Sequence, residues 1–302
     1  MRGRKGLMNP SAIGTIFAIL AAVGFSTKAI FVKLAYQEPV DAVTLLALRM
    51  IFSLPFFLVA AHFSSKGMEP LSRRDLASIV ILGILGYYLA SLLDFQGLLY
   101  ISAAIERLIL FMYPTLVVLI SASISRRFPD RREIFSILLS YGGILLVFAH
   151  DVGDSGNIVA GSLLVFASAL SYAFYLVGAG RLMGRVGATR FTSYASMVSS
   201  VAILLHFFAT RPLSLLHVSA RVDGIAFAMA IFSTVIPFFL LSTGIRLIGP
   251  GKVALIGSVG PIATIWLAHV FLGESFSFWQ ISGSALVLAG VLAISLKPKP
   301  SS

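Results

Sequence analysis

The sequence has no cysteine, two tryptophans and few charged residues, which make up 12% of its 302 residues. Without cysteine the chain forms no disulfide, no thiolate metal site and no cysteine nucleophile. The charged fraction is far below the roughly 25% of soluble domains, whereas hydrophobic residues reach 58%. A soluble fold of this size cannot bury so much apolar surface, and a disordered chain carries far more charge. We therefore expect a polytopic membrane protein.

The sequence also lacks the common catalytic motifs. It has neither H-E-x-x-H nor G-x-S-x-G, and an intramembrane aspartyl dyad would need a second deep aspartate besides Asp94. The segment 244–252 resembles a phosphate-binding loop only superficially, because Val253 stands where Ser or Thr must bind magnesium. The histidines have no metal-ligand spacing. We expect no enzyme, no metal, no cofactor and no ATP-driven pump.

Long apolar runs dominate the rest of the chain. A helix needs about 20 apolar residues to span the hydrocarbon, because lipid offers its backbone no hydrogen bonds. Ten such runs predict an all-α polytopic protein of ten transmembrane helices. They are residues 11–36, 42–63, 76–99, 103–125, 134–149, 158–183, 191–210, 224–245, 253–272 and 277–296.

The positions of the cations test this count. The net charge is +11, from 23 Lys and Arg against 12 Asp and Glu. Seventeen of these cations lie in the tails and loops of one side, whereas the other side holds only Arg211 and Arg221. Loops rich in Lys and Arg stay in the cytoplasm. The pattern predicts a multi-pass protein of the inner (plasma) membrane with both termini cytoplasmic, and it gives no sign of a nucleic-acid partner.

The two halves of the chain repeat each other. An offset of 147 residues pairs Gly97 with Gly244 and Pro114 with Pro261. The repeats are predicted at 1–155 and 156–302, and each holds five spans. Because five is odd, the second repeat enters the membrane from the opposite side. Inverted repeats of this kind are typical of secondary transporters, in which exchanging the conformations of the halves alternates access to a midplane site.

Short motifs in both halves resemble the EamA family of the drug/metabolite transporter superfamily. The second half has Gly251-Lys252-Val253-Ala254-Leu255, then Pro261 and Leu272-Gly273-Glu274, and the first half has Gly24-Phe25-Ser26-Thr27. The resemblance covers the whole chain and implies export of amino-acid-like or related small solutes. One departure is Ser125-Arg126-Arg127, which stands where the first repeat often has Leu-Gly-Glu. A role for a symmetric pair of glutamates is therefore not supported.

Charged residues inside the spans are the main candidates for a site. A charge at the bilayer centre costs at least about 2.5 kcal/mol, so it normally faces a cavity or a partner. We expect Lys28, Arg49 and Asp94 to line an outer vestibule, or alternatively to form fixed ion pairs between helices. Asp94 is also the best candidate for a protonatable group. Glu106 and Arg107 form an outer charge cluster, and the surplus of cations favours an anionic or zwitterionic solute.

Aromatic and proline residues near span centres extend the candidate site. Tyrosine hydroxyls in mid-span need polar partners, so Tyr113, Tyr172 and Tyr175 are expected at the cavity. Proline frees a backbone carbonyl and kinks a helix. The symmetric pair Pro114 and Pro261 is therefore expected to form paired hinges or to line the cavity.

Small residues on the fifth and tenth spans, including Gly142, Gly143 and Gly283, predict close helix packing. Packing within the chain is favoured, with a homodimer interface as the alternative.

The sequence therefore predicts a carrier of a small organic metabolite, not driven by ATP, that works as an exporter by alternating access. A passive channel or facilitator for small solutes is the alternative, and an intramembrane enzyme is the least favoured. A carrier shows saturation and counterflow, which a channel does not.

Overall fold

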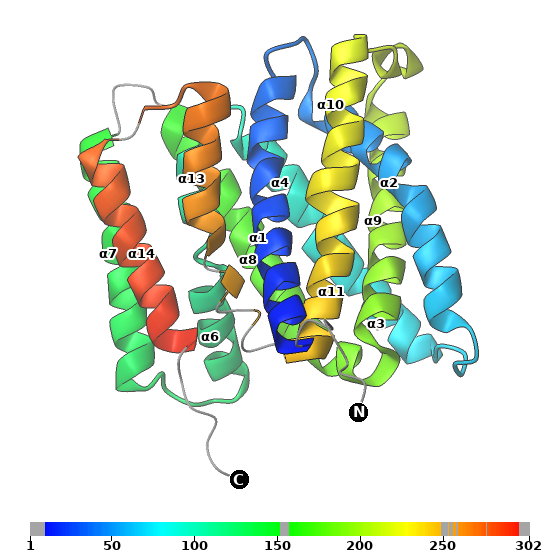
Figure 1. The fold of residues 1–302 in the computed structure, drawn as a ribbon, viewed down its shortest axis with the longest axis horizontal. Coiled ribbons are helices and arrows are strands. Elements are labelled where there is room, and N and C mark those ends of the chain that lie inside the picture. Colours follow the sequence, from blue (N-terminus) through cyan, green and yellow to red (C-terminus); the bar gives the residue numbers. More distant parts are fainter. Residues whose placement is uncertain are drawn as a thin grey trace, which may run out of the picture.

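The computed structural model describes residues 10–151, 157–248, 253, 256–257, 259–275 and 277–295. Over these ranges the chain forms helices and no strand, and Figure 1 shows them standing side by side as one bundle. Seven helical segments are long and apolar enough to cross a membrane. The prediction of an all-helical membrane protein is confirmed.

The first half crosses the bundle five times. The first two passes are α1 (Pro10–Ala35) and α2 (Ala42–Ser65). The third joins α3 (Arg73–Gly83), the π-helical turn η1 (Ile84–Leu89) and α4 (Ala90–Gly97). The fourth is broken into α5 (Ala103–Leu110) and α6 (Tyr113–Ile124), and α7 (Arg131–Asp151) is the fifth.

The second half follows the same order. It begins with α8 (Asn157–Val186) and α9 (Ala188–Thr210), which the short η2 (Leu213–Leu216) follows. The next pass joins α10 (Ala220–Ala230), the π-helical turn η3 (Ile231–Val235) and α11 (Ile236–Ile248). The last described passes are α13 (Val259–Leu272) and α14 (Phe278–Ser295).

The third pass of each half has the same irregularity. η1 begins at Ile84 and η3 at Ile231, which are separated by the 147 residues of the sequence repeat. The helices leading into them begin after Ser72 and Ser219, again at this offset, and each serine hydroxyl accepts a bond from a backbone N–H three residues on. π-helical turns are rare and often lie at functional sites. Both halves therefore share details of backbone conformation as well as sequence.

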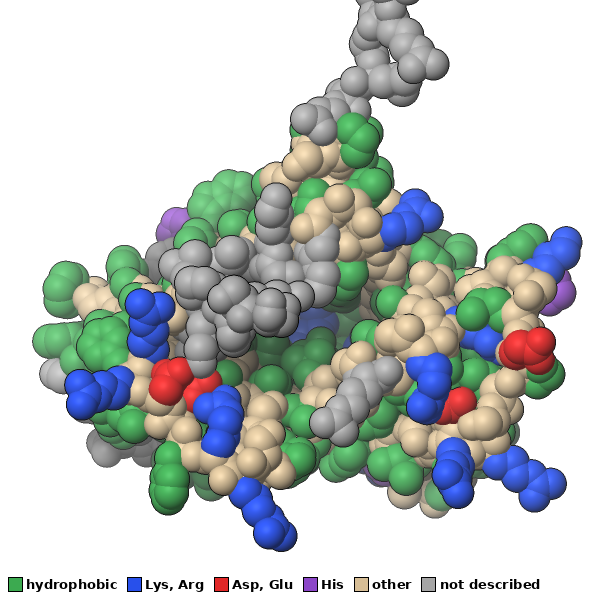
Figure 2. Space-filling model, turned by 90° about the horizontal axis from the view of Figure 1, so that it is seen from below, with side chains coloured by type: hydrophobic (Ala, Val, Ile, Leu, Met, Phe, Trp, Pro, Cys, Tyr) green, Lys and Arg blue, Asp and Glu red, His purple; other side chains and the backbone are tan. Residues whose placement is uncertain are grey.

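The basic loops lie at one end of the bundle. In Figure 1, α1 begins and α14 ends at the lower end. Figure 2 looks at this lower face, and Lys and Arg side chains surround its centre. The described basic residues of the loops and helix ends on this side are Lys66, Arg73, Arg74, Arg126, Arg127, Arg131, Arg132, Arg185, Arg190 and Arg246.

The upper end has fewer cations, and they are paired. Arg221 bonds Glu38 at 3.1 Å, and Arg211 bonds Asp41 at 3.2 Å. Asp41 also caps α2 by accepting bonds from the backbone of Val43 and Thr44. Burial alone would raise the pKa of Asp41, but these bonds and the charge of Arg211 outweigh it and lower that pKa.

Glycines bring α7 and α14 together along the side of the bundle. A Cβ added at Gly143 would lie 2.5 Å from the carbonyl oxygen of Gly283, and one added at Gly283 would lie equally close to the carbonyl of Gly143. Small residues permit this approach of two backbones within a membrane. The glycine faces are therefore used for packing within the chain.

We predict that Gly143→Ala lowers the stability of the protein and that Gly142→Ala raises it. The first forces a methyl group against backbone and should cost about 1–3 kcal/mol, whereas a Cβ at Gly142 meets nothing within 4 Å. Gly142→Ala should gain up to about 1 kcal/mol from helix propensity. Thermal unfolding of the purified variants in detergent measures both. Equal midpoints would contradict the packing of α7 against α14.

Candidate functional site

A central cavity of about 370 Å³ lies between the two halves. Its walls come from α1, α2, η1, α4, α5 and the start of α6 in the first half and from α8, α9, η3 and α11 in the second. This volume is within the range of sites for small organic ligands. Figure 2 shows the lower face hollowed near its centre, with a Lys or Arg side chain deep in the hollow.

Residues at equivalent repeat positions line opposite parts of this cavity. The pairs differ in chemistry, because the first half provides the charged members and the second half uncharged ones. The pairs that line the cavity are Phe25 with Tyr172, Lys28 with Tyr175, Arg49 with Ser196, Gly86 with Ser233, Tyr87 with Thr234, Ser91 with Phe238, and Asp94 with Leu241. A symmetric backbone therefore carries an asymmetric lining.

Lys28 connects three helices of the first half. Its ammonium nitrogen lies 2.6 Å from Asp94 Oδ2 on α4 and 3.1 Å from Glu106 Oε1 on α5. The side chain of Asp94 is 2% exposed and that of Glu106 is fully buried. The structure thus joins Lys28 and Asp94 in an ion pair between α1 and α4. It also places Glu106 in the same cluster, behind the cavity wall and not at an outer mouth.

Arg49 is held by a residue of the other half. Its Nε donates to Thr234 Oγ1 at 3.0 Å, and its guanidinium lies over the ring of Phe95, 5.6 Å from the centroid. Arg49 is 8% exposed and lines the cavity, while its Nη1 finds no partner among the described residues. Arg107 also lines the cavity and leaves its Nε unpartnered over the same ranges. These guanidiniums have donors to spare for an acceptor in the cavity.

The predicted tyrosines form one aromatic cluster in the cavity wall. Tyr172 stacks on Tyr175 at 5.4 Å between centroids and meets the edge of Tyr113 at 5.3 Å. The hydroxyls of Tyr87 and Tyr175 lie 2.9 Å apart. Gly86 in η1 makes room for Tyr175, because a Cβ there would collide with its ring. All three tyrosines predicted at the cavity, Tyr113, Tyr172 and Tyr175, are among the residues that line it.

The upper end of the cavity is closed by bonds between α1 and the segment that joins α4 to α5. Tyr36 donates its hydroxyl to the carbonyl of Phe95 at 2.8 Å. Lys33 donates its ammonium to the carbonyls of Leu98 at 3.2 Å and Ile101 at 3.1 Å. The cation thus satisfies carbonyls near the C-terminal end of α4.

Glu274 closes the same end from the second half. Its Oε1 accepts from Ala103 N at 3.0 Å and its Oε2 from Ala104 N at 3.3 Å. A carboxylate at a helix N-terminus satisfies free N–H groups and favours the helix dipole. This residue belongs to the Leu-Gly-Glu motif, and its bonds join the loop after α13 to the start of α5.

The lower end of the cavity has a different character. Its lining there includes Met183 near the end of α8, Ala188 at the start of α9 and Ile245 near the end of α11. The charged cluster around Lys28 therefore lies deep in the cavity, toward its closed upper end, and not in a vestibule open at the top.

The two symmetric prolines are not among the residues that line the cavity. Pro114 is in the first turn of α6, after the break that follows Leu110. Pro261 is buried in the first turn of α13. Of the two roles predicted for this pair, lining the cavity is not seen among the described residues, and the hinge role stays a prediction.

Sequence reasoning did not single out Thr234 as a site residue. Thr234 lies in η3 at the position equivalent to Tyr87, and it orients Arg49. The sequence signal that could have identified it is the repeat offset of 147 residues from the mid-span residue Tyr87. The π-helical turn that presents it to the cavity has no comparable signature in the sequence.

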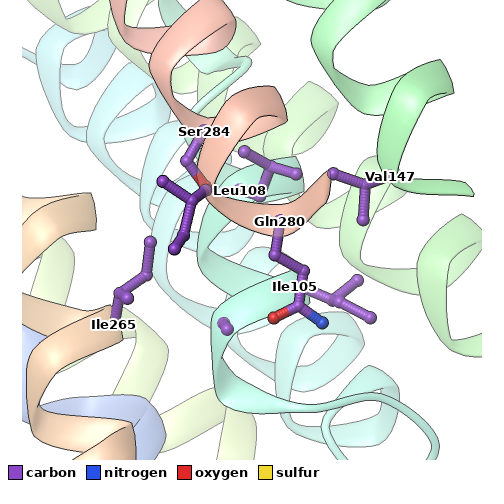
Figure 3. Close-up of a pocket in the computed structure, with 8 residues that line it drawn as sticks. Ile105, Leu108, Val147, Ile265, Gln280 and Ser284 are labelled. Carbon is purple, nitrogen blue, oxygen red and sulfur yellow. The ribbon is translucent and has the colours of Figure 1, made fainter. Parts of the chain in front are cut away.

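A second pocket is too small to hold a metabolite. Its volume is about 10 Å³, the size of one water. Figure 3 shows Gln280 and Ser284 of α14 beside Ile105 and Leu108 of α5 and Val147 of α7. Gln280 Oε1 has no partner within the described ranges. This pocket is a packing defect with room for a single polar molecule.

The bundle and its central cavity define a membrane transporter, and comparison with known proteins agrees. The chain belongs to the EamA-like transporter family, whose model matches residues 12–149 and 159–296. The two matched segments are offset by the same 147 residues as the repeat. Family members are transporters, so the expectation that the chain is not an enzyme is confirmed.

Individual relatives match over nearly their whole length. An uncharacterized transporter YcbK of Bacillus subtilis is 30% identical over 90% of this chain and 89% of its own. An uncharacterized inner membrane transporter YicL of Salmonella typhimurium is 26% identical over 97% and 96%. A solved crystal structure has a TM-score of 0.66 at 19% identity, covering 94% of this chain and 97% of its own, which shows the fold alone.

We predict that Lys28→Met strongly destabilises the protein. Removing the one cation that contacts both buried carboxyl groups leaves them without a counter-charge, at a cost of about 3–5 kcal/mol. Adding Asp94→Asn and Glu106→Gln to Lys28→Met should restore most of the loss.

The matched control is Lys33→Met, since the ammonium of Lys33 contacts only backbone carbonyls. Its effect should be smaller, and the two carboxyl substitutions should not rescue it. Thermal unfolding in detergent compares the variants. A Lys28→Met protein as stable as wild type would show that the ion pairs of Lys28 do not stabilise the fold.

Proposed function

We propose that this transporter is a secondary carrier, not driven by ATP, that exports a small organic metabolite by alternating access. The observation that carries this proposal is a cavity between two repeated halves that is closed at one end by specific bonds. Alternating access needs two related states around one site, and inverted repeats provide them. Opening the upper end would break these bonds, both those within the first half and those from Glu274 across the halves, while the lower end closes.

The basic end of the bundle supports an orientation for this state. Loops rich in Lys and Arg stay in the cytoplasm, so the lower face in Figure 2 is the proposed cytoplasmic face. Both termini would then be cytoplasmic and the cavity inward-facing. The word "inner membrane" in the description of the Salmonella relative supports an inner membrane location.

The lining of the cavity supports a solute of the anionic or zwitterionic class, such as an amino-acid-like metabolite. Arg49 and Arg107 provide unpartnered donors, and guanidinium groups bind carboxylates through parallel hydrogen bonds. The tyrosines of the cavity wall would pack against the apolar part of the solute. Lys28 and Asp94 would complete the site, with Pro114 and Pro261 at the hinges.

The glycines on the facing surfaces of α7 and α14 do not support a homodimer interface through these residues. Gly143 and Gly283 are covered by each other's helices within one chain. A homodimer would therefore not form through Gly143 and Gly283.

Substituted-cysteine labelling tests alternating access directly, because the natural chain has no thiol of its own. Ser91→Cys places one reporter on the cavity wall. In sealed vesicles of known orientation, a membrane-impermeant maleimide should label it faster from the basic side. Adding Glu274→Gln weakens the upper closure and should raise labelling from the opposite side several-fold while lowering it from the basic side.

Glu69→Gln is the control, because Glu69 is an exposed residue of a loop at the lower end. It should leave both labelling rates unchanged. Equal labelling from both sides, with no opposing change in the Glu274→Gln background, would indicate a channel and would overturn the carrier proposal.

A second prediction concerns Arg49. Arg49→Met removes the spare donors without adding a polar group, so counterflow in proteoliposomes should fall at least tenfold. The labelled solutes would be a pool of amino acids and organic acids. Arg221→Met, which affects an exposed pair at the upper surface, should keep wild-type rates. Counterflow at the wild-type rate in Arg49→Met would contradict the proposal that Arg49 binds the solute.

A further inference from the structure

The cluster around Lys28 contains more carboxylates than cations. Lys28 is the only described cation within ion-pair distance of Asp94 or Glu106, and both acids share its single ammonium. If both carboxyl groups were ionised, the three side chains would carry one net negative charge. Such a charge is costly inside a membrane, where water does not screen it.

The other cations near the cluster act on it only from beyond ion-pair distance, Arg49 on Asp94 and Arg107 on Glu106. Arg49 on α2 is directed to Thr234 and Phe95. Arg107, next to Glu106 on α5, forms no ion pair with either acid over the described ranges. Tyr36, which follows α1, donates its hydroxyl to a backbone carbonyl.

Two atoms point to what is missing. Asp94 Oδ1 and Glu106 Oε2 are both buried and have no hydrogen-bond partner in the part of the chain that the structure describes. An unpaired buried carboxylate oxygen costs several kcal/mol. One proton shared by the pair would cancel the excess charge and provide the O–H donor that these oxygens lack. A single proton thus accounts for both the excess of carboxylates over cations and the two unpaired oxygens.

We infer that Asp94 and Glu106 form a proton-binding pair, and that transport by this protein is coupled to proton movement. The coupling rests on the carrier proposal above, whereas the proton site stands on the cluster itself. Asp94 lines the cavity and Glu106 does not, so a proton enters from cavity water through Asp94 and is shared with Glu106. No other bond forms or breaks.

The position of the pair links protonation to conformation. Lys28, Asp94 and Glu106 come from α1, α4 and α5, and these are the elements that the upper closure joins. Opening the upper end would separate α1 from α4 and α5 and expose the acids to water on that side. A proton taken up from one side of the membrane would then be released on the other.

Infrared spectroscopy of the full chain in lipid tests the proton site without a known substrate. At neutral pH, wild type should show the carbonyl stretch of a protonated carboxylic acid, equivalent to one group per molecule. Glu106→Gln and Asp94→Asn should each abolish it, because the remaining acid then pairs with Lys28 alone and ionises.

The control is Glu133→Gln. Glu133 is also a buried acid, but Arg127 binds both of its oxygens at 2.7 Å and 2.9 Å, so its substitution should leave the band intact. Absence of the band from wild type, which needs no variant to fold, overturns the proposal. Survival of the band in either Glu106→Gln or Asp94→Asn also overturns it.

The Ser91→Cys reporter separates this inference from the carrier proposal. The ratio of its labelling from the upper side to that from the basic side, which cancels the ionisation of the thiol itself, should depend on pH in wild type and lose that dependence in Glu106→Gln. A reporter that alternates between sides with no pH dependence would overturn the coupling and leave the carrier standing. A reporter whose labelling does not alternate between the two sides would overturn the carrier proposal and therefore the coupling. In that case an infrared band that behaves as expected would still support the proton site.

Discussion

The rest of the structure depends on one requirement, that charges buried in a membrane find partners. Lys28 meets it for two carboxyl groups at once, with Asp94 Oδ2 at 2.6 Å and Glu106 Oε1 at 3.1 Å from its ammonium. Because these residues come from three helices, the same contacts hold α1, α4 and α5 together toward the upper end of the bundle. The closure of that end by Tyr36 and Lys33 continues this junction. The cavity below it ends on charged side chains, whereas its opposite wall is aromatic.

The two halves share a backbone but not a chemistry. Both third passes contain a π-helical turn at the same repeat position, and each turn presents one residue to the cavity, Tyr87 in the first half and Thr234 in the second. Such a backbone can exchange conformations between its halves, which is what alternating access requires. Under the proposed function, this asymmetric lining would orient a solute with its polar group toward Arg49 and its apolar part toward the tyrosines.

Sequence reasoning predicted the helices, the repeat, the absence of enzyme motifs and the family, because each rests on hydropathy or on local motifs. It also brought Lys28 and Asp94 together, since isolated charges in apolar spans need partners. It did not place Glu106 in the same cluster, because a charge near the end of a span is equally well explained by the interface. It did not predict the bond from Arg49 to Thr234, which lie 185 residues apart. That bond depends on how the halves pack and on a π-helical turn, and neither has a local sequence pattern.

The departure from repeat symmetry at Leu-Gly-Glu has a physical consequence for the two ends of the cavity. Glu274 uses its carboxylate to bond the start of α5 at the upper end. The equivalent position in the first half is Arg127, which pairs instead with Glu133, six residues away and in the same half. The upper end thus has a closing bond across the halves that its counterpart replaces with a local ion pair. A carboxylate at a helix N-terminus contributes about 0.3–2 kcal/mol, so this difference favours the state described here by a modest factor. The binding free energy of a small solute can reverse a bias of that size. The proposed carrier needs such a reversible bias in order to move between its two states.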